Sequence, residues 1–212
     1  MNILFDLDGT LTDPFEGITK CISHVLIMLG RTSPPRKSLQ WCIGPPLKNS
    51  LSLLLASDDD RLVEKALAIY RERFSSVGLF ENKIYQDIPE VLNTLNGMGH
   101  TLYVATSKPT VYAQKIIEYF DLLPYFSRVY GSELDGTRND KSSLISYILQ
   151  REMIASSETV MIGDREHDII GAKANGIESL GVLWGYGTQE ELEISGANAC
   201  VKQPQELVSV ML

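Results

Sequence analysis

The chain has little cysteine, no excess of basic residues and no long apolar run, and each absence excludes a class of protein. Its 3 cysteines are odd in number, lie far apart and do not have the spacing of zinc ligands. They therefore predict neither a disulfide framework nor a zinc site. We expect them to be small core residues of a reduced, intracellular protein; they are Cys21, Cys42 and Cys200.

The charge balance is acidic. Lys and Arg number 19 against 27 Asp and Glu, so the formal net charge is −8. An acidic surface argues against a general binder of nucleic acid polymers or of anionic membranes. It leaves a phosphate substrate possible, because a metal ion or a lysine can reverse the field within one cleft. The oligomeric state stays open.

The first apolar run is short. Ile3 to Phe5 is far too short for a signal peptide or a membrane span, and no positively charged region precedes it. We therefore expect a cytoplasmic protein that does not associate with membranes. Hydrophobic residues make up 44% of the chain and charged residues 22%, which is ordinary for a globular protein. The length suits one domain, or one domain with an insertion.

Two kinds of apolar pattern divide the chain. Residues 15–83 carry apolar side chains at helical spacing, in pieces separated by Pro34-Pro35 and Gly44-Pro45-Pro46, and show no convincing strand. After residue 85, strands alternate with helices, which implies a mostly parallel sheet covered on both faces. We therefore predict an α/β fold with a Rossmann-like parallel sheet core, interrupted by a small all-helical cap.

The expected boundaries follow from this change of pattern. Residues 1–13 and 84–212 are expected to form the core, and residues 14–83 the cap. The expected strands of the core are residues 2–6, 101–105, 128–130, 159–162, 179–183 and 199–201. Its expected helices are residues 87–98, 110–120, 141–151, 167–175, 188–194 and 204–211.

Four polar clusters follow strands of the predicted sheet. In open α/β sheets, ligands bind beyond the carboxyl ends of the strands. Taken alone, each cluster is explained by turn formation or helix capping. Turn chemistry alone does not readily produce all four, in order, at four strand ends. They are Asp6-x-Asp8-Gly9-Thr10, Thr106-Ser107-Lys108, Lys141, and Gly163-Asp164-x-x-x-Asp168.

These side chains suit one kind of chemistry. The carboxylates of Asp6, Asp8 and Asp164 would repel one another in one crevice unless a cation bound there. Oxygen ligands favour Mg²⁺, which also accepts substrate phosphate as a ligand. Lys141 can neutralise a carboxylate nucleophile, and a carboxylate that attacks phosphorus forms an aspartyl phosphate. The hydroxyl group of Thr106 and the backbone N–H of Ser107 can hold phosphoryl oxygens.

The four clusters resemble the motifs of the haloacid dehalogenase superfamily, in its phosphatase branch. The helical insertion is similar to the small helical cap of that superfamily. Phosphoglycolate-phosphatase-like members look most similar, and residues 131–138 and 184–187 also look like those of 5′-nucleotidase-like members. The resembling segments are Phe5-Asp-Leu-Asp-Gly-Thr-Leu-Thr-Asp13, Ala105-Thr-Ser-Lys108, Lys141 and Ile162-Gly-Asp-Arg-Glu-His-Asp168.

The resemblance implies catalytic roles. Asp6 would be the nucleophile, and Asp8 would protonate the leaving oxygen and then activate water. Thr106 would bind the phosphoryl group, and Lys141 would neutralise charge at the nucleophile. An aspartate at position 8 suits a phosphatase or a phosphomutase, both of which must protonate an alkoxide.

The resemblance also implies a metal site. Asp6, Asp164 and the backbone carbonyl of Asp8 would bind Mg²⁺, and Asp168 would orient these ligands or Lys141. The implied activity is Mg²⁺-dependent hydrolysis of a small phosphate monoester, such as phosphoglycolate or a nucleoside 5′-monophosphate. The alternatives are a phosphomutase of the same fold and a non-catalytic binding protein.

Substrate contacts are less well defined than the core motifs. Lys108 follows the phosphate-binding pair and is a candidate to face the cleft. In the cap, the best candidates are Trp41, Gly44 and Lys48, because a Gly-Pro-Pro turn interrupts the helices there. Trp41 has two interpretations, stacking on a base or ordinary packing. The Gly185-Tyr186-Gly187 segment has too few glycines, and no following lysine, to predict a loop that cradles phosphate.

Overall fold

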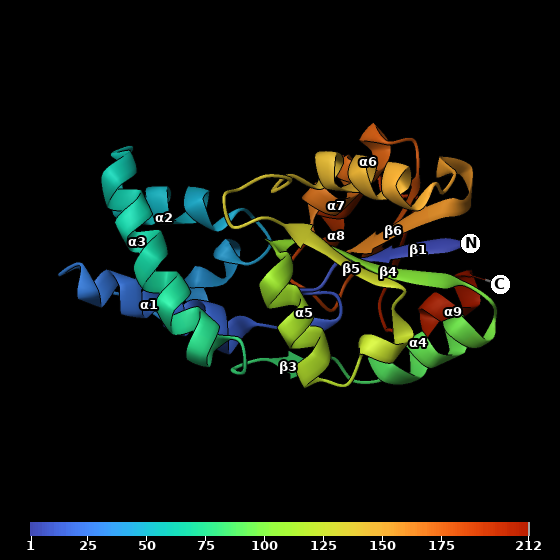
Figure 1. The fold of residues 1–212 in the computed structure, drawn as a ribbon, viewed down its shortest axis with the longest axis horizontal. Coiled ribbons are helices and arrows are strands. Elements are labelled where there is room, and N and C mark those ends of the chain that lie inside the picture. Colours follow the sequence, from blue (N-terminus) through green and yellow to red (C-terminus); the bar gives the residue numbers. More distant parts are fainter. Residues whose placement is uncertain (212) are drawn as a thin grey trace. The chain divides into compact units, whose positions relative to one another are not determined.

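A computed structural model describes residues 1–211, which form two compact units. The first unit contains Met1–Asp13 and the chain from Ile84 onward, and the second contains Pro14–Lys83. The chain therefore leaves the first unit soon after its opening strand and returns to it after the second unit is complete (Figure 1).

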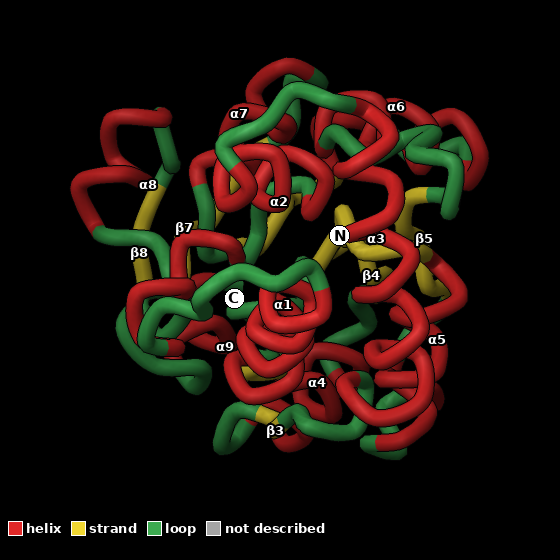
Figure 2. Tube along the Cα trace, turned by 90° about the vertical axis from the view of Figure 1, so that its left-hand side faces the viewer, coloured by secondary structure: helices red, strands yellow, loops and turns green. Residues whose placement is uncertain are grey.

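The first unit is built on a six-stranded sheet in the order β5-β4-β1-β6-β7-β8. All of its recorded pairings are parallel, and Figure 2 shows β8 and β5 towards opposite edges. The predicted parallel sheet is thus confirmed. Its strands are β1 (Asn2–Phe5), β4 (Thr101–Pro109), β5 (Arg128–Ser132), β6 (Thr159–Gly163), β7 (Glu178–Val182) and β8 (Ala199–Val201).

Helices cover both faces of this sheet, as predicted (Figure 1). One face carries α4 (Ile88–Gly97) and α5 (Thr110–Tyr119), with α9 (Glu206–Val210) packed on α4. The other face carries α6 (Lys141–Glu152) and α7 (Glu166–Ala174), and α8 (Gln189–Ser195) packs against α7 and β8. Short 3₁₀ helices occur at Leu123–Tyr125 and Ser156–Glu158.

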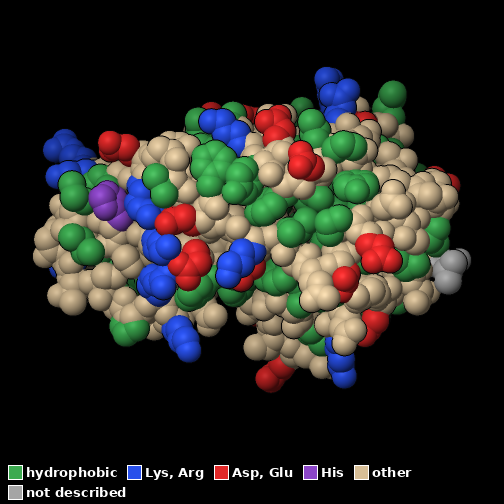
Figure 3. Space-filling model, turned by 90° about the horizontal axis from the view of Figure 1, so that it is seen from below, with side chains coloured by type: hydrophobic (Ala, Val, Ile, Leu, Met, Phe, Trp, Pro, Cys, Tyr) green, Lys and Arg blue, Asp and Glu red, His purple; other side chains and the backbone are tan. Residues whose placement is uncertain are grey.

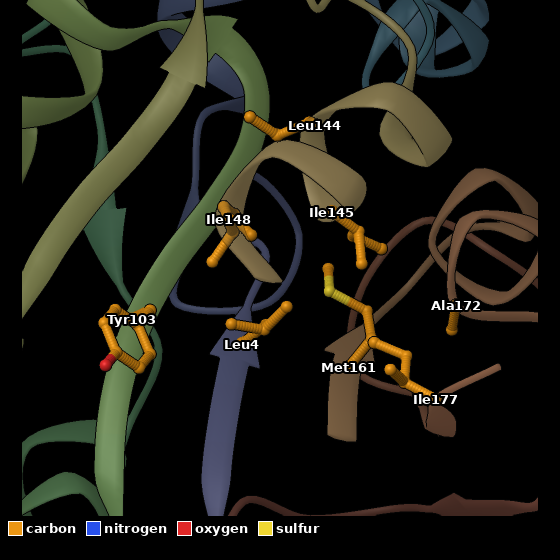
Figure 4. Packing of buried hydrophobic residues seen from close by; sticks show 9 residues of the cluster. Leu4, Tyr103, Leu144, Ile145, Ile148, Met161, Ala172 and Ile177 are labelled. Carbon is orange, nitrogen blue, oxygen red and sulfur yellow. The ribbon is translucent and has the colours of Figure 1, made fainter. Parts of the chain in front are cut away.

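Apolar side chains of three central strands pack against α6 and α7 (Figure 4). Each large apolar side chain buried in this way stabilises the fold by about 1.5–3 kcal/mol. This core holds the starts of α6 and α7 in place beyond the strand ends. Its labelled members are Leu4, Tyr103, Leu144, Ile145, Ile148, Met161, Ala172 and Ile177.

The second unit is helical. It contains α1 (Phe15–Met28), a 3₁₀ helix at Arg36–Cys42, α2 (Leu47–Leu55), α3 (Asp60–Arg73) and a π-helical turn at Phe74–Gly78. The α1 helix packs against α3 and this turn. A Cβ atom added to Gly17 would lie 2.1 Å from the carbonyl oxygen of Gly78, so the close approach of these segments requires glycine at position 17.

Ion pairs join the segments of this unit at its surface. Glu81 pairs with Lys20 at 3.1 Å and with Arg73 at 2.8 Å, and Glu16 pairs with Arg36 at 2.6 Å. Acidic and basic side chains are interspersed over this part of the surface, at the left of Figure 3. Because such partly exposed pairs each contribute only about 0–1 kcal/mol, the buried apolar residues dominate the stability of the unit.

A second, two-stranded sheet pairs β2 (Thr12–Asp13) with β3 (Lys83–Ile84). The prediction that residues 15–83 contain no strand is therefore wrong at Lys83, because two residues are too few to show an alternating pattern. The β4 strand also continues past Ala105 to Pro109, with a register shift over that stretch. No helix among residues 1–211 is long and apolar enough to span a membrane.

Candidate active site

Three neighbouring strands carry their polar clusters to one edge of the sheet. Phe5 of β1 pairs in register with Val104 of β4 and with Ile162 of β6. Asp6, Thr106 and Gly163, which begin the polar clusters, follow these paired residues by one or two positions and therefore lie near one another at this end of the strands. The backbone N–H of Asp6 also donates to the carbonyl oxygen of Ile162 at 2.9 Å. The parallel register thus brings Asp6 close to the cluster that follows β6.

Lys141 is the central cation of this cluster. It opens α6 directly after Asp140, whose side chain caps the helix by accepting from the Ser143 N–H. The Lys141 Nζ lies 2.9 Å from Asp6 Oδ1, 2.7 Å from Asp168 Oδ1 and 2.8 Å from the Ala105 carbonyl oxygen. Burial would lower the pKa of Lys141, but the carboxylates of Asp168 and Asp6 raise it above its ordinary value. The two carboxylates therefore favour the charged form of this buried lysine.

Three carboxylates lie close together, and Lys141 pairs with two of them. Asp6, Asp164 and Asp168 each place an oxygen within 4.8 Å of the others, and all three are buried. Burial, followed by repulsion from Asp6 and Asp168, raises the pKa of Asp164 well above its ordinary value. Burial also raises the pKa of Asp168, to about 6, although Lys141 opposes this rise. A single lysine thus leaves the cluster short of positive charge.

Asp164 has a free coordinating position. Its Oδ2 accepts a hydrogen bond of 2.8 Å from the Tyr186 N–H, whereas its buried Oδ1 has no hydrogen-bond partner among the described residues. Oxygen-only donors with an unpartnered carboxylate oxygen are the donor set that Mg²⁺ prefers. The residues present therefore fit a magnesium ion.

The loop after β7 holds Asp164. A Cβ atom added to Gly185 would lie 2.4 Å from the Asp164 Cβ, and one added to Gly187 would lie 1.9 Å from the Asp164 carbonyl oxygen. The Tyr186 hydroxyl donates to Asp13. The amino-acid sequence predicts no role for this loop. Two glycines flanking an aromatic residue beyond a strand end were the available signal for a tightly packed loop.

The carboxylate of Asp168 is held at the N-terminus of α7, the helix to which Asp168 belongs. Its Oδ2 accepts from the Arg165 N–H at 3.1 Å, and a Cβ atom added to Gly163 would lie 2.2 Å from its Cγ. Its other oxygen pairs with Lys141. The structure also brings Asp168 into the carboxylate group. That Asp168 orients the metal ligands or Lys141 stays a prediction.

Asp8 is not a member of that carboxylate group and pairs with a different lysine. Its Oδ2 lies 2.5 Å from the Nζ of Lys108, and both side chains are nearly buried. Burial raises the pKa of Asp8, an effect that Lys108 opposes and Asp6 reinforces. Thr106 is buried, and its Oγ1 accepts from the Lys108 N–H at 3.3 Å. Ser107 is half-buried, and its carbonyl oxygen accepts from Ser132 Oγ at 2.8 Å.

The turn that carries Asp8 has one further support. The Trp184 Nε1–H donates to the Thr10 carbonyl oxygen at 3.0 Å. Gly9 has a φ of +89°, and a Cβ atom there would lie 2.2 Å from Asp164 Oδ2. Only glycine suits this position. Glycine is therefore required after Asp8 for two reasons, the positive φ of the turn and the close approach of the Asp164 side chain.

The remaining candidates lie in the helical unit. Trp41 lies in the last turn of the 3₁₀ helix and is 41% exposed, and Gly44 follows this helix with a φ of +103°. Lys48 pairs with Glu64 at 2.9 Å and with Asp60 at 3.3 Å, both on α3. Their contact with substrate stays a prediction.

Comparison with known proteins agrees with this geometry. The family model for haloacid dehalogenase-like hydrolases matches residues 3–182. A 5′-nucleotidase of Pseudomonas aeruginosa is 49% identical over 191 residues, which cover 90% of this chain and 86% of the relative. The crystal structure of a predicted phosphatase from Clostridium acetobutylicum superposes with a TM-score of 0.95 at 42% identity, covering 99% of this chain and 97% of the other.

Two other relatives carry different names. The tyrosine-protein kinase PtkA of Mycobacterium tuberculosis is 33% identical over 90% of this chain and 65% of its own length. A phosphoglycolate phosphatase of Colwellia psychrerythraea is 26% identical over 97% of this chain and 94% of its own. The family model alone covers most of the chain, including every cluster of the candidate site. The chain therefore belongs to the haloacid dehalogenase-like hydrolase family.

Proposed function

We propose that this enzyme hydrolyses phosphate monoesters of small metabolites through an aspartyl phosphate formed on Asp6. A phosphatase is the activity that its family and its relatives' names support. The observation that carries the mechanism is the contact of buried Lys141 with Asp6 and Asp168. This contact places a buried positive charge beside Asp6, which offsets the negative charge that a carboxylate nucleophile carries.

The first step transfers the phosphoryl group to Asp6. An Asp6 oxygen forms a bond to phosphorus while the bond from phosphorus to the leaving oxygen breaks, and Asp8 gives that oxygen a proton. Thr106 and the Ser107 N–H hold the phosphoryl oxygens. Lys141 remains charged and offsets the negative charge around Asp6. Positioning and electrostatics then supply most of the rate enhancement.

The second step regenerates the enzyme. Asp8, now ionised, accepts a proton from water, whose oxygen forms a bond to phosphorus. The bond between phosphorus and the Asp6 oxygen breaks, so inorganic phosphate leaves and both side chains return to their initial states. The same group therefore serves first as general acid and then as general base.

Asp6, Asp164 and the backbone carbonyl of Asp8 would hold Mg²⁺. When bound, the ion supplies positive charge to the carboxylates and to the phosphoryl oxygens. The unpartnered Asp164 Oδ1 and the raised pKa of Asp164 support this assignment. Asp168 contributes through its ion pair with Lys141.

A nucleoside 5′-monophosphate is the leading substrate class, supported by the relative named 5′-nucleotidase. Phosphoglycolate is the second, supported by the relative named phosphoglycolate phosphatase. A panel of both classes, assayed for phosphate release with and without Mg²⁺, tests the proposal. Release from neither class, with the protein folded and Mg²⁺ present, would contradict it.

Transfer to an acceptor other than water is the competing activity, supported by the relative named a tyrosine-protein kinase. The same assay, repeated with ATP and a tyrosine-containing peptide, separates the two, because a mutase or kinase forms a new phosphate ester. Inorganic phosphate as the only phosphorus product supports hydrolysis, and an isomeric ester or phosphotyrosine contradicts it.

Gly185→Ala is expected to weaken the metal site. The added Cβ atom would meet both the Asp164 side chain and the Gly9 carbonyl oxygen at 2.4–2.5 Å, so Asp164 must move. We expect the Mg²⁺ concentration for half-maximal activity to rise by about 10- to 100-fold, as for other disturbed supports of metal ligands. Gly97→Ala is the matched control, since its Cβ atom meets nothing within 4 Å. Equal metal dependence of both variants would refute this role of the loop.

Trp41→Ala and Lys48→Ala are expected to change the ranking of substrates. We infer that the helical unit acts as a cap and that residues 41–48 contact the leaving group. The ratio of kcat/KM between a nucleoside 5′-monophosphate and 4-nitrophenyl phosphate should fall by about tenfold, because one lost contact corresponds to about 1.4 kcal/mol. Lys37→Ala, a change at an exposed residue of the same unit, is the control. If both variants keep the wild-type ratio of kcat/KM, residues 41–48 do not determine which substrate is preferred.

A further inference from the structure

The contact between Lys108 and Asp8 divides the two Asp8 oxygens into different environments. Lys108 Nζ lies 2.5 Å from Asp8 Oδ2, and the side chains of Lys108 and Asp8 are only 6% and 11% exposed. The other oxygen, Asp8 Oδ1, is buried and has no hydrogen-bond partner among the described residues. Asp8 Oδ2 is therefore held by Lys108, and Asp8 Oδ1 is available for a hydrogen bond to another group.

The backbone directs Lys108 towards Asp8. A Cβ atom on Gly131 of β5 would lie 2.3 Å from the Lys108 carbonyl oxygen, so the two strands approach closely at this point. Ser132 Oγ donates to the Ser107 carbonyl oxygen, and Thr110 Oγ1 donates to that of Ser132 at 3.2 Å. Ser107 and Thr110, which lie before and after Lys108 in the chain, are thus both hydrogen-bonded to Ser132 at the end of β5. These bonds fix the path of the chain through Lys108.

An ammonium group can only donate hydrogen bonds. Asp8 Oδ2 must therefore be the accepting oxygen whether Asp8 is a carboxylate or a carboxylic acid. In the acid form, the carbonyl-type oxygen is the stronger acceptor, so the contact with Lys108 favours the proton on Oδ1.

We propose that Lys108 is a positioning residue that makes Asp8 Oδ1 the oxygen that exchanges the proton with the leaving group. The inference rests on the proposed function, in which Asp8 is the general acid. In the first step, the Oδ1–H bond breaks and its proton goes to the leaving oxygen as that oxygen separates from phosphorus. Lys108 takes no part in the proton transfer. This assigns Lys108 to Asp8, whereas the sequence had suggested a contact with substrate.

Leaving-group dependence tests this proposal. Benzyl and phenyl phosphate are similar in size, but a benzyl alkoxide needs a proton to leave far more than a phenolate does, and 4-nitrophenolate needs one least. In Lys108→Met, kcat/KM for benzyl phosphate should fall by about 10²- to 10⁴-fold, the usual contribution of a general acid. For 4-nitrophenyl phosphate the loss should stay below about tenfold. The ratio kcat/KM reports the transfer to Asp6, free of the second step.

Three further proteins complete the experiment. Asp8→Asn should show the same dependence, since it removes the acid itself. Lys108→Arg keeps the donors and should recover most of the activity towards benzyl phosphate, and thermal unfolding of each variant monitors the fold. Lys115→Met, the same change at an exposed residue of α5, should leave all three rates unchanged.

The outcomes separate the two proposals. An equal loss of kcat/KM for all three esters in Lys108→Met means that Lys108 binds the shared phosphoryl group, which overturns the positioning role while the proposed function stands. A rise in KM with kcat unchanged has the same meaning. If the wild-type enzyme hydrolyses none of the esters, the proposed function fails and this inference fails with it.

Discussion

Asp6→Asn is expected to lower phosphatase activity by about 10⁴-fold or more. The nucleophile acts together with its partner residues, so its loss alone costs nearly as much activity as the loss of the whole set. The amide is nearly isosteric but carries no negative charge with which to attack phosphorus. Its oxygen still accepts from Lys141, which keeps its ion pair with Asp168 at 2.7 Å. Turnover should therefore be lost while the fold is kept, as measured by phosphate release and by thermal unfolding.

Asp121→Asn is the matched control for this variant. Asp121 is exposed and has a φ of +55°, a conformation that asparagine tolerates well. Both variants make the same chemical change, and the control should retain full activity. Substantial turnover by a folded Asp6→Asn protein would show that another group attacks phosphorus.

Removing divalent metal is expected to abolish turnover, and Mg²⁺ should restore it. Without a cation, the buried carboxylates of Asp6, Asp164 and Asp168 repel one another, with only Lys141 between two of them. Ca²⁺ should support turnover poorly, since it takes more ligands in a looser geometry. Phosphate release after treatment with chelator, and after adding back each ion, measures the effect.

Binding of Mg²⁺ should also stabilise the fold. At about 100 times the dissociation constant, a ligand specific for the folded state adds about 2.7 kcal/mol to the free energy of unfolding. Asp164→Asn should remove this increase, which thermal unfolding with and without Mg²⁺ would show. Full activity in metal-free buffer would contradict the metal site, and an Mg²⁺ effect retained in Asp164→Asn would contradict the role of Asp164.

The amino-acid sequence was sufficient to predict the parallel sheet and the clusters at its strand ends. Both depend on local patterns: apolar runs bounded by polar residues, and helical periodicity between them. Parallel strands end at one edge, so order along the chain already implied that Asp6, Lys141 and Asp164 meet. In the structure, Lys141 contacts Asp6, and Asp6 and Asp164 lie close together with Asp168. The catalytic roles themselves stay predictions.

Other features required the tertiary structure, because they join segments that have no shared local pattern. The Tyr186 N–H donates to Asp164, which lies 22 residues earlier in the chain. The Lys108 side chain points towards Asp8 and not into solvent. The side-chain direction of a lysine depends on the neighbouring strand, here through Gly131 and Ser132 of β5, and periodicity carries no information about it. The sequence alone therefore determined which residues meet at the sheet edge, and the packing between strands decided which atoms face each other there.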